Sequence, residues 1–480
     1  MASPVLTLAQ MRSWETASWA AGIHERELIE TVGQRVGQWL LARTQLDDRI
    51  LFLTGAGHNG DDARAAAQWL GWRRRHRVLR VTDPATQSAE VHRALAAGVE
   101  WVVDAWFGIG LNREFSEPWR RLLEDFNEMT RQHPCRVVAM DVPSGLRDDA
   151  GHHAGAIVRA DFTLTVGAVK RGLVGLEAAG RVEVLRDVGL LPGHCASSHA
   201  ELEASARLHW LDADDFTNFP PARPISGHKG TFGHLLIVAG SVGYHGAAVL
   251  AAQAALRAGP GLVTVLTDPG VYGPIAAQLA QPMVHPWSAQ WCMPNSVSAV
   301  VLGPGLASRE LPPGLVQLAL HLWQEFPGPV LADANALPWV VAAPARPGLP
   351  RVVTPHPGEA AGLLGRTSDL IQSDRVGSAL GLRERFGLGS IAVLKGFQTL
   401  IAGPGGLWIN PTGNAELAQG GAGDVLSGFL GGLLARRLPV EKCVCFGVWE
   451  HGAAADRLAR QHRHWTVDDL QIELGVRNGN

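Results

Sequence analysis

The chain has 480 residues, enough at roughly 100 to 200 residues per domain for about two to four domains, of which we expect two. Hydrophobic residues make up 46% and charged residues 18%, which excludes a disordered or fibrous protein and allows a large buried core. The net charge of −3 offers no chain-wide positive field, so generic nucleic-acid binding is disfavoured. The 56 glycines are in excess without a collagen-like period, and such glycines often form tight loops that approach ligands.

The sequence lacks the usual signals of secretion and membrane insertion. It begins without a basic segment followed by an apolar one, and no window holds 18 uninterrupted apolar residues. We therefore expect a cytoplasmic protein with neither membrane nor nucleic-acid partners. The five cysteines form no CxxC pair, which is typical of free thiols in a reducing compartment. The basic run Arg73–Arg77 is interpreted as a solvated helix end before a strand at Val78–Val81, rather than as a phosphate-binding patch.

The first part of the chain alternates short apolar runs with helical stretches. Runs rich in β-branched residues lie at 50–55, 77–82, 99–108, 136–145 and 161–167. Continuous runs of this kind predict parallel strands that are buried on both faces and joined by helices. We expect a doubly wound, Rossmann-like three-layer α/β sandwich over residues 1–205, with its ligands at the carboxyl ends of the strands.

A second α/β domain is predicted over residues 215–480. Residues 191–224 have mixed polarity, two proline clusters and no regular period, so we place the domain boundary near residue 205. The alternation then restarts. Strands are predicted at 234–241, 261–267, 299–305, 329–335, 351–359, 391–396, 399–403 and 407–413, and helices at 246–258 and from 420–424 onward.

The sharpest motif is the glycine-rich run Gln419–Gly428. Its small residues precede an apolar helical stretch, so backbone N–H groups at a helix N-terminus would attract a phosphate. Asp424 would stand beside this anion site, where a carboxylate can take a proton from an attacking hydroxyl. The alternative is an ordinary helix-capping aspartate. The preceding glycines favour the catalytic interpretation, because a cap needs only one of them.

Two further segments carry polar groups at predicted strand ends. Lys395–Thr399 lies between two strands, in a turn able to present a lysine and a hydroxyl to a nucleotide. In Thr354–Glu359, two prolines restrict the backbone around His356 and fix its imidazole at the end of a strand. For His356 a structural role and a functional role both stay open.

These motifs occur together in one known family. HKGTFGHLLIVAGS, GYHGAAVLAAQAALRAGPGLVTV, GPGL, LADANAL, TPHPGE, VLKGFQT, NPTGN and GGAGDVLSG have the order found in the carbohydrate-kinase-like NAD(P)H-hydrate dehydratases. The first half resembles the NAD(P)H-hydrate epimerases through GAGHNGDD at 55–62, DAWFGIGLNRE at 104–114 and DVPSGL at 141–146. The whole chain therefore resembles the bifunctional NAD(P)H-hydrate repair enzymes, and this implies a ribokinase-like second domain.

The resemblance implies repair of NADHX and NADPHX, the hydrated forms of NADH and NADPH. The first domain would interconvert the R and S epimers, with potassium as its cofactor. The second would use ADP and Mg²⁺ to phosphorylate the ring hydroxyl of the S epimer and then eliminate phosphate, leaving AMP. Besides these small molecules we expect a second copy of the chain as partner in a homo-oligomer; Trp14, Trp19 and Trp39 suit either an interface or the core.

The motifs of the second domain assign its expected site residues. Asp424 would be the catalytic base. The hydrate would contact Ala247, Gly305, His356 and Asp424. The nucleotide would contact Lys395, Gly396, Phe397, Gln398, Thr399 and Gly423. Asp333 and Asn335 occupy a position where the family usually has two aspartates, so a charge that would strengthen metal binding is lost.

The motifs of the first domain assign a second site. Potassium would be held by Asn59, Asp104 and Ser144. The hydrate would contact His58, Asn59, Gly60, Asp61, Asp62, Gly108, Ile109, Gly110, Leu111, Asn112, Arg113, Glu114 and Asp141. Asp61 and Ala63 replace glycines of the usual loop, and Asp61 adds a negative charge where backbone is expected to approach a pyrophosphate.

Two alternatives remain. In the first alternative, residues 1–205 are a non-catalytic binding or interaction module fused to an active dehydratase; the charge of Asp61 motivates this hypothesis. Otherwise the second domain is a ribokinase-like kinase of a small hydroxylated vitamin precursor, which would share the GAGD loop. The TPHPGE, NPTGN and HKG-x-x-G motifs argue against the kinase.

Overall fold

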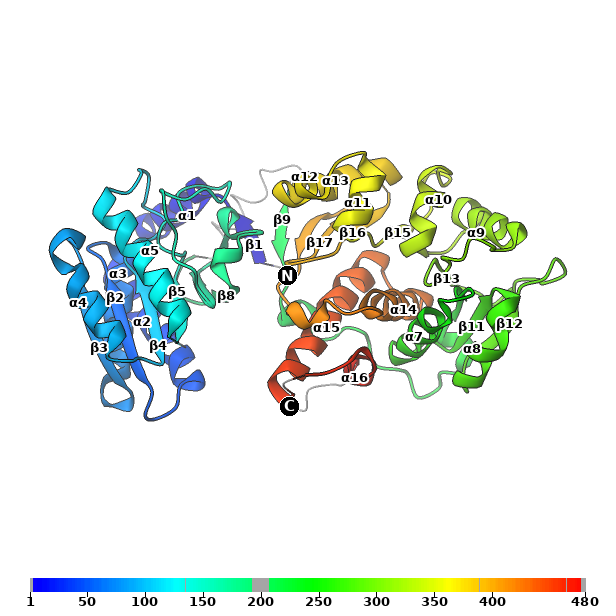
Figure 1. Cartoon of the computed structure of the whole chain (residues 1–480), viewed down its shortest axis with the longest axis horizontal. Coiled ribbons are helices and arrows are strands. Elements are labelled where there is room, and N and C mark those ends of the chain that lie inside the picture. The colour runs from blue at the N-terminus through cyan, green and yellow to red at the C-terminus, as the bar shows by residue number, and fades with distance from the viewer. Residues whose placement is uncertain (1–2, 134, 192–206, 388, 463, 476–480) are drawn as a thin grey trace. The chain divides into compact units, whose positions relative to one another are not determined.

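The computed structural model describes residues 3–133, 135–191, 207–387, 389–462 and 464–475 (Figure 1). These residues form two compact units, an N-terminal one within residues 3–203 and a C-terminal one within residues 204–480. The sequence-based boundary near residue 205, like Cys195, lies outside the described residues. Among the described helices none is both long and apolar enough to cross a membrane. The cysteines that the structure describes are free thiols (Cys135, Cys292, Cys443 and Cys445).

The N-terminal unit is built on a parallel sheet. Its strands are β2 (Arg49–Thr54), β3 (Arg75–Arg80), β4 (Trp101–Ala105), β5 (Arg136–Met140), β6 (Phe162–Val166) and β8 (Arg181–Leu185), in the order β3-β2-β4-β5-β6-β8. Its helices are α1 (Leu8–Ala20), α2 (Glu25–Arg43), α3 (His58–Leu70), α4 (Pro84–Ala96) and α5 (Glu117–Gln132). A short strand β1 (Ser3–Leu6) pairs in parallel with β7 (Val169–Lys170).

Helices cover both faces of this sheet, so the unit has three layers. Successive side chains of a strand point to opposite faces. Ile50 and Phe52 belong to a buried cluster that includes residues of α1, α2 and α3, whereas Leu51 and Leu53 belong to a second cluster with α4 and α5. Burial on both faces explains why the strand sequences are continuously apolar. The predicted Rossmann-like sandwich is confirmed.

The basic run Arg73–Arg77 needs a correction. It does not end a helix before a strand at Val78, because β3 already begins at Arg75, directly after a short 3₁₀ turn at Gly71–Arg73. β3 lies at the edge of the sheet, where alternate charged side chains reach solvent. Of the three tryptophans considered for an interface, Trp14 and Trp39 lie in the core, and only Trp19 is exposed.

The C-terminal unit contains a longer, mostly parallel sheet. Its strands are β9 (Leu208–Trp210), β10 (His234–Val238), β11 (Leu262–Thr267), β12 (Met283–Pro286), β13 (Ala299–Leu302), β14 (Val330–Ala332), β15 (Arg351–Val353), β16 (Ile391–Leu394), β17 (Leu400–Gly403) and β18 (Gly406–Ile409). Their order is β12-β11-β10-β13-β14-β15-β16-β17-β18-β9, and β17 runs antiparallel to both of its neighbours.

Helices again cover both faces of the sheet (Figure 1). The helices are α7 (His245–Arg257), α8 (Tyr272–Gln278), α9 (Pro313–Glu325), α10 (Leu337–Val341), α11 (Pro357–Leu364), α12 (Ser368–Ser373), α13 (Arg375–Phe386), α14 (Ala422–Ala435), α15 (Val440–Gln461) and α16 (Val467–Glu473). α7, α14 and α15 lie on one face, and α11 and α13 lie on the other (Figure 1). This is the second α/β layer structure that the sequence predicts.

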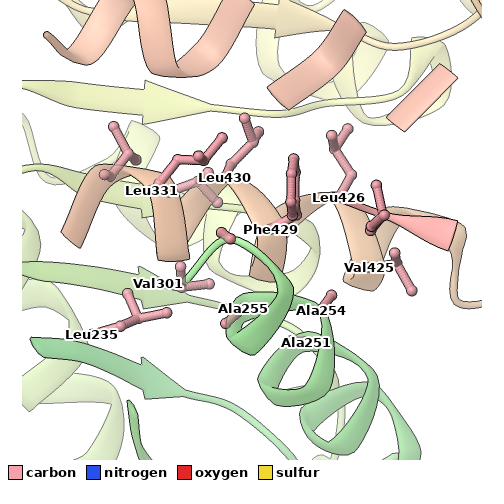
Figure 2. Close-up of a cluster of buried hydrophobic side chains, with 14 of the residues drawn as sticks. Leu235, Ala251, Ala254, Ala255, Val301, Leu331, Val425, Leu426, Phe429 and Leu430 are labelled. Carbon is pink, nitrogen blue, oxygen red and sulfur yellow. The ribbon is translucent and has the colours of Figure 1, made fainter. Parts of the chain in front are cut away.

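Helix α14 is the buried centre of the C-terminal unit. It is apolar or small around its whole circumference from Val425 to Ala435, as expected of a helix without a solvent face. Phe429 packs in the cluster shown in Figure 2. Gly428 allows α14 and α7 to approach closely, because a Cβ there would lie 2.0 Å from the carbonyl oxygen of Ala251. This packing fixes the N-terminus of α14, and with it the glycine-rich run, at one end of the sheet.

Each sheet has a point where the strand order reverses direction. In the N-terminal unit this point lies between β2 and β4, and in the C-terminal unit between β10 and β13. The loops after such neighbouring strands separate to opposite faces and leave room for a ligand beyond the carboxyl ends. The motifs at 55–62 and 104–110 follow β2 and β4, and those at 240–247 and 303–306 follow β10 and β13.

Candidate active sites

The loops after β10 and β13 are joined at the reversal point of the C-terminal sheet. Ser241 Oγ donates a hydrogen bond of 2.7 Å to the carbonyl oxygen of Gly305. Gly305 has φ 65°, and a Cβ on it would lie 2.3 Å from the carbonyl oxygen of Tyr244 and 2.9 Å from Cβ of Ala247. Ala247 and Gly305, both expected to contact the hydrate, therefore lie side by side. Only glycine permits this approach.

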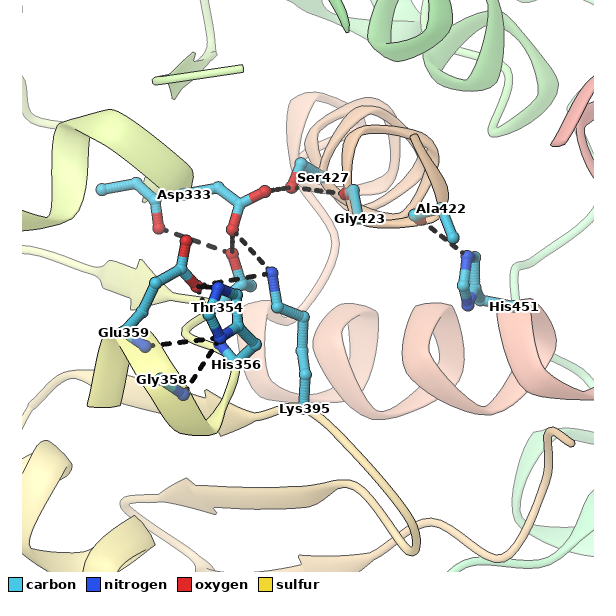
Figure 3. Close-up of polar contacts among 11 residues, drawn as sticks. Asp333, Thr354, His356, Gly358, Glu359, Lys395, Ala422, Gly423, Ser427 and His451 are labelled. Atoms are coloured by element: carbon cyan, nitrogen blue, oxygen red, sulfur yellow. Dashed lines mark hydrogen bonds and ion pairs between the residues drawn. The ribbon is translucent and has the colours of Figure 1, made fainter. Parts of the chain in front are cut away.

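Asp333, at the end of β14, is the centre of a buried polar network (Figure 3). Its Oδ1 accepts hydrogen bonds from Lys395 Nζ at 3.0 Å and from Thr354 Oγ1 at 2.8 Å. Its Oδ2 accepts from Ser427 Oγ at 2.5 Å. A buried carboxylate requires this kind of pairing. The network ties the ends of β14, β15 and β16 to α14 and fixes the direction of the Lys395 ammonium.

Asp424 is the third residue of α14, and its role as helix cap is excluded. The N-cap is Gly421, in the left-handed conformation with φ 96°. Burial, and then the charge of Asp333, raise the pKa of Asp424 to about 6, while Lys395 opposes the shift. A Cβ on Gly423 would lie 3.5 Å from Lys395 Nζ, so this ammonium lies at the helix N-terminus. A carboxyl that ionises near neutral pH beside a cation suits a general base.

His356 caps helix α11. Its Nδ1 accepts hydrogen bonds from the backbone N–H groups of Gly358 and Glu359 at 3.0 and 3.3 Å, and the Glu359 carboxylate accepts from the His356 N–H at 2.8 Å. The structural alternative for His356 is thus realised. Because Nδ1 is occupied as an acceptor, the other ring nitrogen is the one left for a ligand; it lies 3.6 Å from Glu359 Oε2, and the side chain is 56% exposed.

The nucleotide segment Lys395–Thr399 forms the turn between the antiparallel strands β16 and β17, as the sequence indicated. Thr399 Oγ1 donates to the carbonyl oxygen of Gly396 at 2.9 Å, and Phe397 is 48% exposed. The guanidinium of Arg375 donates a hydrogen bond of 3.3 Å to the Lys395 carbonyl oxygen and so stabilises the turn. Burial lowers the pKa of Arg375 to about 10, which leaves it charged at neutral pH.

Several supporting residues were missed by the sequence analysis. Ser427 lies inside the recognised run Gln419–Gly428 and Arg375 lies in a segment without a motif, and neither was assigned a role. His451, on α15, is buried and bonds through Nε2 to the carbonyl oxygen of Ala422 at 3.1 Å (Figure 3). Burial lowers its pKa to about 4, so it is neutral and donates this bond at physiological pH. A single histidine in an apolar helix gave no indication of this contact. Asn335, by contrast, was singled out and its side chain is exposed.

In the N-terminal unit, Asn59, Asp104 and Ser144 meet near the reversal point. Asp104 is completely buried, and its two oxygens accept from Ser144 Oγ at 2.6 Å and Ser144 N at 2.8 Å. Burial raises the pKa of Asp104 to about 6, although these bonds oppose the shift. Asn59 Nδ2 donates to the carbonyl oxygen of Phe107 at 2.9 Å, and its buried Oδ1 has no partner within the described parts of the chain. This orphaned acceptor and the neighbouring buried carboxylate fit a monovalent cation.

The expected phosphate loop at 55–62 leads into α3, whose first residue is His58. Gly60 packs closely against the backbone of Gly55, since a Cβ on Gly60 would lie 2.5 Å from the carbonyl oxygen of Gly55. Asp61 does not stand alone: it forms an ion pair with Arg64, which also donates to Gly55 at 3.2 Å. The charge that made this loop questionable is therefore partly neutralised within the same helix.

The loop after β4 approaches this region through Gly108, where an added Cβ would lie 3.3 Å from Cβ of Asn59. Leu111 is buried, whereas the last part of the expected contact segment is exposed (Asn112, Arg113 and Glu114). Asp141 follows β5 and forms an ion pair with Lys170, a buried residue that the sequence analysis did not single out.

Two α/β units, each with buried ionisable groups and a helix N-terminus at the carboxyl ends of its strands, define a two-domain protein of the nucleotide-handling α/β class. A family model described as NAD(P)H-hydrate dehydratase matches residues 235–474, and one described as YjeF-related protein N-terminus matches residues 75–172. The bifunctional NAD(P)H-hydrate repair enzyme of Gloeobacter violaceus is 35% identical over 98% of this chain and 96% of its own length. The chain belongs to the family of bifunctional NAD(P)H-hydrate repair enzymes.

A second relative supports this membership. The bifunctional NAD(P)H-hydrate repair enzyme of Escherichia coli is 39% identical, over 75% of this chain and 68% of its own. Among solved structures, the ADP/ATP-dependent NAD(P)H-hydrate dehydratase from Bacillus subtilis, co-crystallised with ATP and Mg²⁺, is 33% identical, covers 53% of this chain and 91% of its own, and has a TM-score of 0.47. The C-terminal unit is the ribokinase-like domain that the sequence predicts.

Proposed function

We propose that residues 1–205 interconvert the R and S forms of NADHX and NADPHX, and that residues 215–480 dehydrate the S form at the expense of ADP. Membership of the family supports both activities. The observation that carries the dehydratase is the placement of Asp424, with its pKa raised to about 6, in the first turn of α14 beside Lys395. These groups are the base and the cation that phosphoryl transfer to a hydroxyl needs.

The dehydratase reaction follows from these positions. The hydrate would lie against Ala247 and Gly305. Asp424 takes the proton of the ring hydroxyl while the hydroxyl oxygen attacks the β-phosphorus of ADP, and AMP leaves. Lys395 and the first N–H groups of α14 oppose the charge on the phosphoryl oxygens. The phosphorylated ring then loses phosphate from C6 and a proton from C5 to water, and the C5=C6 double bond re-forms to give NADH or NADPH. We assign the exposed Nε2 of His356 to the hydrate.

The turn Lys395–Thr399 would hold the nucleotide. Phe397 offers an exposed ring on which adenine can stack, and the backbone of Gly396 to Gln398 together with Gly423 lines the phosphate path. Within the described ranges, no cluster of three or more His, Cys, Asp or Glu side chains is arranged to hold a metal ion. Mg²⁺ would thus be bound mainly through the nucleotide phosphates, whose charge it neutralises.

For the epimerase, the orphaned Oδ1 of Asn59 with Asp104 and Ser144 would hold potassium. The ion would supply a fixed positive charge at this site. We assign hydrate binding to His58–Asp62, Gly108–Glu114 and Asp141. The Asp61–Arg64 ion pair supports this assignment over the binding-module alternative, because it removes much of the expected repulsion.

Two assays test the proposal. Purified protein with the S hydrate and ADP should form NADH, followed by its absorbance, with AMP and phosphate released in equal amounts. A phosphorylated product that accumulates would identify a kinase instead. In a second assay, with potassium, the R hydrate should convert to the S form faster than it does spontaneously. An unchanged rate would make the N-terminal unit a binding module.

A further inference from the structure

Lys170 is a buried lysine in the N-terminal unit, outside every motif named above. Its side chain is 1% exposed. Nζ donates to Asp141 Oδ1, to Thr165 Oγ1 at 3.1 Å and to the carbonyl oxygen of Val166 at 2.8 Å, so each of its three protons has an acceptor. Burying an ammonium is strongly unfavourable unless it is paired in this way. The fold therefore commits the charge of Lys170 to Asp141.

Asp141 is held in an unusual conformation. It follows β5 with φ 62°, a left-handed backbone that is unfavourable for a non-glycine residue unless its surroundings enforce it. Its Oδ1 accepts from Val166 N at 2.9 Å as well as from Lys170. Its Oδ2 has no hydrogen-bond partner among the residues that the structure describes. One oxygen is thus anchored, and the other is free for a ligand.

Two further carboxyl groups, from different helices, interact with this pair. Burial, and then the charges of Asp141, Asp61 and Glu15, raise the pKa of Asp62 well above its usual value, while Lys170 opposes the shift. Glu15, on α1, also has a raised pKa, chiefly through burial and then through Asp141. The charge of Asp141 acts on both of these carboxyl groups, so Asp62 and Glu15 lie in the same region of the unit as the Lys170–Asp141 pair.

We propose that Lys170 is a positioning residue that aims Asp141 as the base of the epimerisation. This inference rests on the proposed epimerase function. In the hydrate, the hydroxyl-bearing C6 adjoins ring nitrogen N1. Asp141 Oδ2 removes the hydroxyl proton, the oxygen electron pair forms the C6=O bond, the C6–N1 bond breaks with its electrons on N1, and Asp141 passes the proton on to N1.

The reverse reaction then yields the other epimer. Rotation about the C5–C6 bond turns the opposite face of the carbonyl toward N1. N1 attacks C6 and gives its proton back to Asp141, and the carbonyl oxygen takes this proton from Asp141. No oxidant, reductant or further reactant is consumed.

The test uses the full-length chain with potassium and follows epimerisation of the R hydrate, with dehydratase activity as the measure of intact protein. Lys170→Met should lower kcat at least about 100-fold and change KM by less than about threefold. Arg43→Met is the matched control, since it breaks an ion pair with Glu183 in the same unit and should leave kcat unchanged. Folded Lys170→Met protein with a kcat within about threefold of wild type would overturn the inference.

A second variant keeps the test decisive if Lys170→Met does not fold. Thr165→Val retains the Lys170–Asp141 pair but removes one acceptor of Nζ and a 3.4 Å hydrogen bond from Thr165 Oγ1 to Asp141 Oδ1. It should lower kcat about three- to tenfold, and an unchanged kcat contradicts the positioning role. A wild-type chain that does not accelerate epimerisation at all would instead refute the proposed epimerase function.

Discussion

The pH dependence of the dehydratase tests the role of Asp424 directly. Burial and the Asp333 charge place its pKa at about 6. A base acts only when ionised, and the ionised fraction of such a group rises from about one tenth at pH 5 to about nine tenths at pH 7. We expect kcat to rise roughly tenfold across this window, with its midpoint near pH 6.

The same shift has the opposite sign for stability. Because the pKa of Asp424 in the folded chain lies above the unfolded value of 3.8, the folded state binds this proton more tightly. Its contribution to stability is fully present below pH 4 and is lost as the pH rises through 6, by at most about 3 kcal/mol. Asp424→Asn removes this penalty. At pH 7 the variant should be at least as stable as wild type while losing about 10²- to 10⁴-fold in kcat.

The assay measures NADH formation from the S hydrate with saturating ADP between pH 5 and 8 at constant ionic strength, together with thermal unfolding. Asp369→Asn is the control, because Asp369 lies in the first turn of another helix, α12, and is exposed. Glu359→Gln should move the midpoint to lower pH, since the Glu359 charge helps to raise the pKa of Asp424. A kcat that does not change between pH 5 and 7, or an Asp424→Asn variant with more than about a tenth of wild-type activity, would refute the assignment.

Three further outcomes are expected. Gly428→Ala should destabilise the C-terminal unit by about 3 kcal/mol or more in denaturant unfolding, because its Cβ would lie 2.0 Å from a backbone oxygen of α7; unchanged stability would contradict this packing. Asp61→Gly should lower the epimerase KM by no more than about fivefold, because Arg64 already neutralises the charge of Asp61. A larger decrease in KM would show that Arg64 does not neutralise this charge. Ser144→Ala should raise the potassium concentration for half-maximal epimerase activity at least about tenfold and leave the dehydratase unchanged; equal potassium response would exclude this site.

Much of the fold follows from local sequence patterns. The apolar runs at 50–55, 234–241 and 299–305 all become buried parallel strands, because only a sheet covered on both faces requires continuous apolar residues. Short strands in which polar residues interrupt the apolar ones were missed, such as Arg181–Leu185 and Leu208–Trp210. Their pairing depends on neighbours far away in the sequence, so no local pattern predicts them.

The sequence likewise predicted some features of the candidate sites and not others. The sequence indicated Asp424, Lys395 and His356 through neighbouring glycines and prolines. These residues determine the local backbone conformation, so they can be recognised in the sequence alone. It did not indicate that His356 caps a helix, because capping depends on where the helix begins.

By itself, then, the sequence determined two α/β domains and the loops that carry the chemistry, and its excess of glycine marks those loops. The tertiary structure alone decided what surrounds each group: the pairing of Asp61 with Arg64, the Lys170–Asp141 pair, and the burial that raises the pKa of Asp424. The physical reason is that the charge state of a side chain depends on desolvation and on neighbours brought together by folding. Neither can be read from the separation of residues along the chain.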